Sequence, residues 1–321
     1  MAESPSIIHN RDLATDFIAK SGVLSRYPKV SEQVECLPLD SARLPAFSYN
    51  PSIYRKEGRL WMTYRYHYEA NFKTRIGIAE IKENGEVLKS QDIPLSNDSC
   101  EDARLFTLHG EPWMSWVEAR FTDGHYAATS VVKYGKLSSD WKITTVHQPA
   151  RHANDGNYMQ KNWCFFESDR ENLFCVYRSW PEQIIFHVQG DSVVSEYKSP
   201  GVKWPYGETR GGNIVPYKDK LLHVFHSSTQ QGIGQREQRY YVGACLMEPK
   251  PPFSVLAVIK KPIIYGSEVD NLTPEQRASC RQWKSNVVFP CGLLTEGEGW
   301  ILACGINDSA CALVKIKDLN L

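Results

Sequence analysis

The 321-residue chain lacks several features that would assign it to common classes of protein. Neither charge is in surplus, with 37 Lys and Arg against 37 Asp and Glu, which argues against a nucleic-acid or polyanion binder. No apolar run approaches the length of a membrane span. The N-terminus, MAESPSIIHNRD, has neither a basic flank nor a long apolar stretch. We therefore expect no signal peptide and predict a cytoplasmic protein.

Closely spaced cysteine pairs are also missing. The nine cysteines are odd in number and include no C-x-x-C pair, and several lie in apolar runs such as LFCVY and WILACG. This pattern predicts reduced, mostly buried thiols, not a disulfide framework or a zinc site. No histidine set has metal-ligand spacing, and no Walker or dinucleotide glycine motif occurs. We predict no metal and no organic cofactor.

Helix signals are few. NRDLATDFIAKSG has apolar residues on one face and Gly22 as a C-terminal cap, which predicts a short N-terminal helical segment. TPEQRASC has Thr273 as N-cap and Pro274 at the first helical position, which predicts one helical insertion. The remaining chain consists of short β-type runs separated by turn residues, as in all-β proteins.

One layout recurs five times in these runs. It comprises a polar residue, an apolar segment, a turn and a second apolar segment, followed by another strand-like run. Superposing the five copies aligns one polar residue from each: Asn50, Asp102, Asn162, Asn213 and Asn286. The ends of the second segments then align as Arg65, Val117, Arg178, His226 and Gly305.

The spacing of these copies indicates a β-propeller. Successive copies start 52, 60, 51 and 73 residues apart, which is too long for small solenoid repeats and suits propeller blades. The sequence therefore predicts a single five-bladed domain over 1–321, with blades over roughly 45–95, 100–150, 158–200, 208–262 and 283–318. A β-sandwich is the structural alternative, but it would not explain the recurring polar residue.

The stretch CEDARLF begins a β-type run with two carboxylates, Glu101 and Asp102, although acidic residues are poor strand formers. In isolation it reads as a charged loop end with a local pair between Asp102 and Arg104. In a propeller the innermost strand of each blade lines the central channel, so the five aligned residues would form a ring at one mouth. Asp102 would be the only carboxylate in a ring of asparagines, a typical setting for a ligand pocket.

A series of short motifs follows one another over roughly residues 45–316: YNPSIY, LWMTYR, TRIGIA, CEDARLF, QKNWCFF, VYRSWP, the His226 region, YYVGACLME, KKPIIYGSE, SNVVFPCG and GIND. In this order the motifs resemble glycoside hydrolase family 130, the inverting β-mannoside phosphorylases and their hydrolytic relatives. Such enzymes are five-bladed propellers, in agreement with the repeat count, and glycosyltransferase family 108 resembles them.

The resemblance also implies roles for individual residues. Asp102 takes the place of the aspartate in the E-D-P-R motif, which implies that it is the general acid and protonates the glycosidic oxygen through a hydroxyl of the sugar. Lys161, Arg178 and His226 take the places of the phosphate-binding residues. The residues expected to bind the sugar are Asn50, Arg65, Arg104, Asp308 and, from its place in the ring, Asn162.

Most of these residues have plainer explanations. Lys161 would be an exposed strand start, Arg178 a surface ion pair and His226 a core histidine, a choice that His223 on the same strand face complicates. Asp308 would cap a turn.

The sequence also departs from the family pattern. EDAR replaces EDPR, which removes a rigid turn but no functional group. The arginines usual in the second blade are hard to place, with Arg120 as one candidate. The stretch SSTQQGIGQREQRY, with Arg236 and Arg239, is unlike a typical member.

The balance of charged candidates favours phosphorolysis. An ordinary inverting glycosidase needs two carboxyl groups, whereas phosphate brings its own nucleophilic oxygen and requires cations to hold it. We predict a phosphorylase that cleaves β-mannosides with inorganic phosphate, its co-substrate, to give α-mannose 1-phosphate. The partners would be a mannoside or oligosaccharide and phosphate, with no nucleic acid and no membrane, and a homo-oligomer stays open.

Three other functions remain open. A β-mannoside hydrolase would need a base, for which Glu101, Glu118 and Glu268 are candidates. A nucleotide-sugar-dependent β-mannosyltransferase and a sugar-binding propeller without catalysis are the others. Four tryptophans are candidate platforms for an acceptor sugar or else blade-packing residues: Trp116, Trp163, Trp180 and Trp204.

Overall fold

The computed structural model describes residues 34–37, 39–67, 73–97, 99–122, 126–149, 160–169, 171–230, 238–266, 274, 278, 284–319 and 321. The predicted N-terminal helical segment lies outside the described residues. The predicted helical insertion does too, apart from Pro274 and Ala278, which are both helical. A short 3₁₀ helix, η2 (Ser41–Arg43), is capped by Asp40, whose carboxylate accepts a hydrogen bond from the backbone nitrogen of Ala42 at 3.2 Å.

The strands form five antiparallel sheets, each taken largely from one continuous part of the chain. The first sheet contains β2 (Tyr49–Lys56), β3 (Arg59–His67), β4 (Thr74–Ile81) and β5 (Val87–Asp92). The second contains β6 (Cys100–Leu108), β7 (Glu111–Thr122), β8 (Tyr126–Leu137) and β9 (Ile143–His147). The third contains β10 (Cys164–Glu167), β11 (Leu173–Arg178), β12 (Glu182–Gln189) and β13 (Ser192–Pro200).

The last two sheets complete the series. The fourth contains β14 (Glu208–Tyr217), β15 (Lys220–Gln230), β16 (Gln238–Met247) and β17 (Val255–Val258), with β18 (Ile264–Tyr265) also pairing with β16. The fifth contains β19 (Val288–Glu296), β20 (Gly299–Ile306) and β21 (Ala310–Ile316). Its outermost strand is β1 (Val34–Leu37), which pairs antiparallel with β21 and comes from the other end of the sequence. The sequence pattern did not predict this strand.

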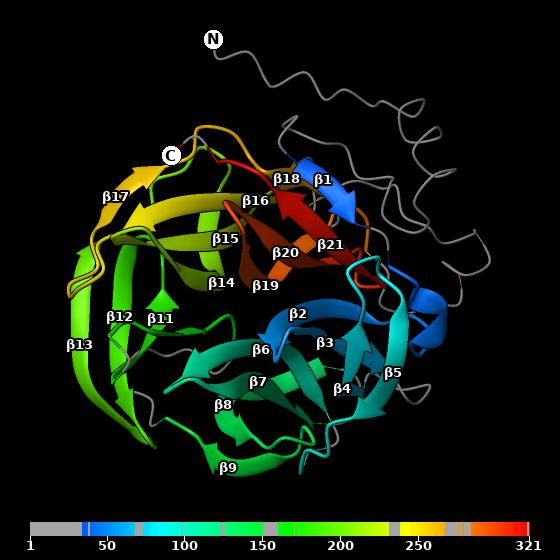
Figure 1. Ribbon diagram of the computed structural model, residues 1–321. Coiled ribbons are helices and arrows are strands. Elements are labelled where there is room, and N and C mark those ends of the chain that lie inside the picture. Colours follow the sequence, from blue (N-terminus) through cyan, green and yellow to red (C-terminus); the bar gives the residue numbers. More distant parts are fainter. Residues whose placement is uncertain are drawn as a thin grey trace.

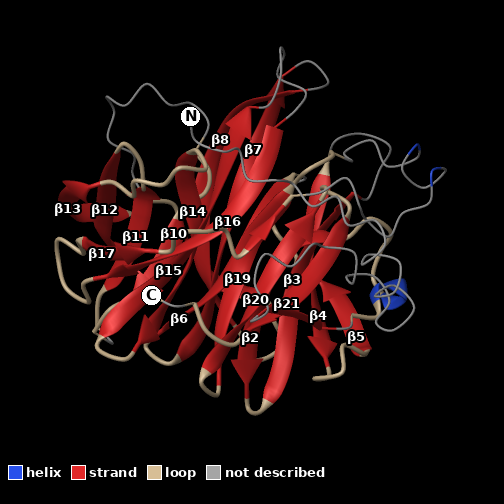
Figure 2. Ribbon diagram, turned by 90° about the horizontal axis from the view of Figure 1, so that it is seen from above, coloured by secondary structure: helices blue, strands red, loops and turns tan. Residues whose placement is uncertain are grey.

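The five sheets stand around a common centre, as Figure 1 shows. Each innermost strand contacts the innermost strands of both neighbouring sheets, so β2, β6, β10, β14 and β19 form a closed cycle. Seen from above in Figure 2, strands are the predominant secondary structure of the described chain. The prediction of an all-β, five-bladed propeller is confirmed.

The hydrophobic core lies between the faces of neighbouring sheets. Between the first and second sheets, Trp61 and Ile76 pack with Leu105 and Trp116. Between the second and third, Phe106 and Val117 pack with Trp163 and other side chains of the third sheet. This packing fixes each innermost strand against the channel, because every blade is held on both faces.

The recurring polar residue has a backbone cause. Asn50, Asp102, Asn162 and Asn286 have φ angles of 50°, 53°, 64° and 62°. Among residues with a side chain, Asn and Asp adopt this left-handed conformation most readily. The first two lie at register shifts in their strands, between Tyr49 and Ser52 and between Glu101 and Arg104. A bend at the start of the innermost strand therefore selects the polar residue before any ligand is considered.

The strand registers show that the sequence superposition misplaced two residues, Asn213 and Gly305. In the first sheet the residue that pairs with Arg65 is Tyr49, directly before Asn50. In the fourth sheet His226 pairs with Arg210, so the residue equivalent to Asn50 is Gly211, not Asn213. A Cβ atom on Gly211 would lie 1.8 Å from the carbonyl oxygen of Asn162, so no side chain fits there.

The other displaced residue is in the fifth sheet. There Val288 pairs with Ile306, as Ser52 pairs with Thr63 in the first sheet. The residue equivalent to Arg65 therefore lies two places after Ile306. It is Asp308 and not Gly305.

Candidate functional site

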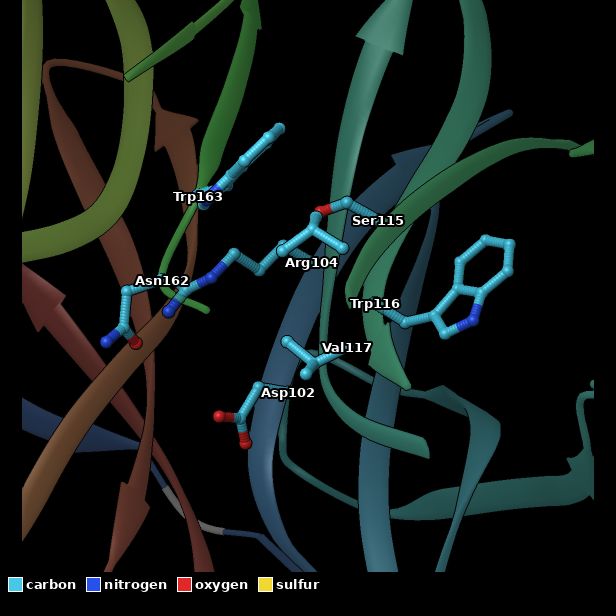
Figure 3. Close-up of a pocket in the computed structure, with 8 residues that line it drawn as sticks. Asp102, Arg104, Ser115, Trp116, Val117, Asn162 and Trp163 are labelled. Atoms are coloured by element: carbon cyan, nitrogen blue, oxygen red, sulfur yellow. The ribbon is translucent and has the colours of Figure 1, made fainter. Parts of the chain in front are cut away.

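Asp102 lies at the start of β6, where the left-handed bend turns its carboxylate toward the first sheet. Oδ1 accepts a hydrogen bond from Asn50 Nδ2 at 2.7 Å and lies 3.3 Å from Nη1 of Arg65. The side chains of Asp102 and Arg65 are only 13% and 12% exposed. In Figure 3, Asp102 lines a hollow together with Arg104, Asn162 and Trp163 and with Ser115, Trp116, Val117 and Val132.

The charge of Asp102 is set by opposing effects. Burial raises the pKa of its carboxyl group, but the charge of Arg65 and the hydrogen bond from Asn50 lower it, with further help from Arg104 and Lys161. The net result is a pKa below the ordinary value for aspartate. At neutral pH Asp102 is therefore a carboxylate in the unliganded protein.

Arg65 is held from several sides. Its Nε donates to Thr74 Oγ1 at 3.2 Å, and its Nη2 lies 2.6 Å from Glu101 Oε1. The guanidinium also lies 5.0 Å from the centre of the Tyr49 ring. Tyr49 is itself fixed, because its hydroxyl lies 3.0 Å from Nε2 of His67. Burial and the charge of Arg65 lower the pKa of His67 to about 4, so that ring is a neutral acceptor for the hydroxyl.

Arg104 lies in the channel, but its guanidinium is already hydrogen-bonded to other strands of the propeller. Its Nη1 donates to the carbonyl oxygens of Gly212 and Pro290 at 3.0 and 2.9 Å and to Asn213 Oδ1 at 3.2 Å. These partners belong to β14 and β19, so one guanidinium joins the second, fourth and fifth sheets. Its Nη2 has no hydrogen-bond partner, and the residue is only 4% exposed.

Two of the predicted phosphate ligands, Lys161 and Arg178, are exposed. Lys161 directly precedes Asn162, and its charge reaches Asp102, whose pKa it lowers. Arg178 ends β11 at the position equivalent to Arg65. It instead forms an ion pair with Glu182, with Nη2 3.5 Å from Oε2.

The third predicted phosphate ligand, His226, is buried. Nδ1 lies 2.8 Å from the carbonyl oxygen of Gly211, and the ring stacks on Tyr240 with 5.9 Å between centroids. Burial and the charge of Arg104 lower the pKa of His226 to about 3. The ring is therefore neutral at neutral pH. Because a carbonyl only accepts, Nδ1 carries the hydrogen and Nε2 is left as an acceptor.

The remaining carboxylates near the mouth already have partners. Asp308 follows β20 with a φ of 50°, and its Oδ2 lies 2.9 Å from Nζ of Lys284. Glu118 is buried, bonded to Lys133 at 2.7 Å and to the Trp116 indole at 3.1 Å. Glu268, Arg236 and the side chain of Arg120 lie outside the described part of the chain.

The four candidate tryptophans differ in how far they are exposed. Trp116, Trp163 and Trp204 are 2%, 4% and 9% exposed and belong to the blade packing. Trp180 is 40% exposed. It lies in the loop between β11 and β12, two residues after Arg178 and at the same end of the blade as the mouth ring.

Sequence reasoning missed several residues of the mouth. Tyr49, Thr74 and Lys284 hold Arg65 or Asp308, yet each looks like an ordinary strand or loop residue in the sequence. Tyr49 could have been found from its place before Asn50, since Glu101 holds the same place before Asp102. Nothing in the sequence indicates Thr74 or Lys284.

In the described residues, no group of three or more His, Cys, Asp or Glu side chains could hold a metal ion. Within the same part of the chain, no helix has the length and apolar character needed to span a membrane. The eight cysteines that the structure describes are buried, which confirms their predicted burial.

Several solved structures have the same fold. A β-1,2-mannobiose phosphorylase from Listeria innocua, in complex with β-1,2-mannobiose, has a TM-score of 0.61 at 14% identity, covering 92% of this chain and 94% of that one. MPT-4, a mannose phosphorylase from Leishmania mexicana in complex with a phosphate ion, has a TM-score of 0.60 at 15% identity, with 96% and 92% covered. A glycosyl hydrolase from Bacteroides ovatus has a TM-score of 0.57 at 13% identity, with 92% and 93% covered.

A comparison with curated protein sequences finds no match. A comparison with family models matches residues 21–320 to the glycoside hydrolase family 130 model, described as beta-1,4-mannooligosaccharide phosphorylase. This match spans nearly the whole chain, including all five sheets and Asp102. The chain therefore belongs to glycoside hydrolase family 130.

Proposed function

We propose that this protein is an inverting phosphorylase that cleaves β-mannosides with inorganic phosphate and releases α-mannose 1-phosphate, reversibly. The observation that carries the proposal is the state of the carboxylates at the mouth. Among the carboxylates that the structure describes there, Asp102 lines the hollow, while Glu101 pairs with Arg65, a partner that it shares with Asp102, and Asp308 pairs with Lys284. One carboxyl group suffices for phosphorolysis, while an inverting hydrolase needs a second one to activate water.

As the general acid, Asp102 needs a proton that the unliganded protein does not supply at neutral pH. Phosphate arriving nearby adds negative charge and raises the pKa of Asp102, so phosphate binding and protonation favour each other. The carboxyl group then gives its proton to a sugar hydroxyl, which passes its own proton to the glycosidic oxygen. A phosphate oxygen attacks the anomeric carbon from the opposite face as the bond to the leaving sugar breaks.

The phosphate ligands would be assembled on binding. Lys161 is exposed and can turn toward an anion beside Asn162. Arg178 would exchange Glu182 for phosphate, a small cost because that ion pair is exposed. His226 would accept a hydrogen bond at Nε2 from a protonated phosphate oxygen or a sugar hydroxyl. It would not contribute a charge.

The sugar would be held by the residues around Asp102. Asn50, Arg65 and Asn162 lie beside it, the charge of Asp308 reaches Arg65, and Arg104 would act from within the channel. For the acceptor we propose Trp180, because an exposed aromatic face at the mouth suits a sugar ring. Buried cysteines without a C-x-x-C pair suit a reducing compartment, so we propose that the protein is cytoplasmic.

The test is synthesis in the reverse direction. The protein is incubated with α-mannose 1-phosphate and a panel of acceptor sugars, and phosphate release is followed, with Asp102→Asn as the control. We expect release that depends on both the acceptor and Asp102. No release with the panel, together with turnover of GDP-mannose, would identify a nucleotide-sugar transferase instead. Release of free mannose from β-mannosides without phosphate would identify a hydrolase.

A further inference from the structure

Two consecutive carboxylates contact one guanidinium at the mouth of the channel. Arg65 places Nη2 2.6 Å from Glu101 Oε1 and Nη1 3.3 Å from Asp102 Oδ1. Consecutive residues of a regular strand point to opposite faces of the sheet. The register shift between Glu101 and Arg104, with a φ of 53° at Asp102, turns the second side chain so that both reach Arg65. The backbone is thus bent to bring the two carboxylates together.

Arg65 cannot move freely to either carboxylate. Its Nε donates to Thr74 Oγ1 at 3.2 Å, and Thr74 is in turn anchored by donating to the Cys100 carbonyl at 2.8 Å. The flat face of the guanidinium lies over Tyr49. A guanidinium fixed in this way interacts with both carboxylates at once, and the shorter of its two contacts is with Glu101.

We propose that Glu101 is a positioning residue, which takes a share of the charge of Arg65 and so leaves Asp102 able to take up a proton. Arg104 and Lys161 also face Asp102 and disfavour its protonation, so an undivided ion pair with Arg65 in addition would hold the proton off Asp102. The negative charge of Glu101 acts in the same direction, because a neighbouring like charge disfavours a second carboxylate. The inference rests on the proposed function, in which Asp102 must be protonated to act as the acid.

The first test is the pH profile of kcat for phosphate-dependent turnover, because kcat reports the acid in the complex with phosphate and substrate. A general acid loses activity as pH rises through its pKa, so Asp102 determines the alkaline limb. In Glu101→Gln we expect that limb to move to lower pH by about one unit. In Arg65→Gln we expect it to move to higher pH, because the cation that opposes protonation is gone. A merely structural role for Glu101 would not give opposite shifts in these two variants.

The propeller offers a matched control at the opposite end of the first sheet. Arg55 also bridges two carboxylates, with Glu83 at 2.7 Å and Glu296 at 2.6 Å. Glu296→Gln removes the same kind of contact far from Asp102, and we expect it to leave the limb in place. Glu101→Asp retains the negative charge, and we expect a limb close to that of the natural protein.

A second measurement does not depend on turnover. The pKa of Asp102 is read from carbon-13 NMR titration of its carboxyl group, with Asp102→Asn identifying the signal. We expect a lower pKa in Glu101→Gln and an unchanged one in Glu296→Gln. Absence of turnover in the natural protein would refute the proposed function alone, since the titration still decides the role of Glu101. An unchanged or raised pKa in Glu101→Gln would overturn the inference, as would a limb that moves equally in Glu296→Gln.

Discussion

His226 directs Nδ1 at the carbonyl oxygen of Gly211, 2.8 Å away, and so gives its ring hydrogen to a partner that can only accept. Gly211 has no side chain because the backbone of Asn162 occupies the space where a Cβ would be. The hydrogen bond lies within the fourth sheet, between β15 and β14, at the place where Gly211 packs against the backbone of Asn162 from the third blade. Burial and the charge of Arg104, acting against this hydrogen bond, lower the pKa of His226 and keep its ring neutral, with consequences for stability as well as for binding.

Acid should destabilise this propeller through its buried histidines. Burial lowers the pKa of both His223 and His226 to about 3, below the ordinary value of about 6.5. The unfolded chain therefore takes up these protons first, and the free energy of unfolding falls as pH drops below about 6.5. Each histidine contributes a slope of about 1.4 kcal/mol per pH unit in this range. Urea unfolding at pH 7, 6 and 5 measures the slope.

The control for this prediction is His223→Phe. His223 is fully buried, its Nε2 has no hydrogen-bond partner and its Nδ1 has a weak contact of 3.9 Å with Cys245 Sγ, so Phe removes a titrating group at the cost of that one contact. We expect the slope between pH 6 and 5 to decrease by the contribution of one histidine. An unchanged slope would show that His223 does not titrate on unfolding.

Gly305→Ala should displace the Asn50 side chain, which donates a hydrogen bond to Asp102. A Cβ atom at Gly305 would lie 1.7 Å from Asn50 Oδ1, so the amide that bonds to Asp102 must move. We expect the free energy of unfolding to fall by about 1–3 kcal/mol and turnover to decrease with it. In an Asn50→Ala background the cost of Gly305→Ala should be smaller, which a double-mutant cycle measures. Equal costs in both backgrounds would contradict the proposed contact.

Arg104→Lys tests whether Arg104 joins the blades. A lysine keeps the charge but has a shorter side chain, so its ammonium does not reach the place of Nη1 between the carbonyls of Gly212 and Pro290 and the side chain of Asn213. We expect a loss of about 2–4 kcal/mol in the free energy of unfolding, measured in urea. Arg210→Lys is the control, because Arg210 is exposed beside Glu208 and should change stability little. A loss of activity with full stability would mean that Arg104 acts only on the substrate.

Trp180→Ala should weaken acceptor binding without affecting phosphate. We expect the KM for the acceptor to rise about tenfold, equivalent to about 1.4 kcal/mol, with the KM for phosphate unchanged. Leu256→Ala removes a similarly exposed apolar side chain, 48% exposed, on the outer strand β17, and should leave both constants unchanged. A rise in both KM values would indicate that Trp180 positions the mouth as a whole.

The propeller was predictable because each blade repeats the same pair of strands, and strand pairs leave a clear apolar pattern. Not all of the aligned residues could be placed from the sequence. A bend at the start of an innermost strand leaves one residue unpaired, and the amino-acid composition of the strand does not reveal it. Asn213 was therefore placed at the ring position that Gly211 occupies, and Gly305 was aligned in place of Asp308. A glycine required by a neighbouring carbonyl has no signature in the sequence alone.

The position of Asp102 at the mouth was predictable, and the surroundings of the other candidate residues were less so. Asp102 follows from its place in the repeat, and Asn50 and Arg65 from the same alignment. The orientation of Arg178 could not be read from the sequence, because it depends on whether Glu182 or the channel offers the better partner. The neutral charge of His226 could not be read from the sequence either. It depends on burial and on Arg104, which is more than a hundred residues away in sequence.

The strand β1 pairs with β21, so residues 34–37 depend on residues 313–316 for their backbone hydrogen bonds. During synthesis the early segment must wait for almost the entire protein to emerge before it finds its partner. Contacts between such distant segments form slowly, because the loop between them has to close first. Until then the four earlier sheets stand as an incomplete circle with an open gap. This interval is when the nascent protein would be most exposed to misassembly with another copy.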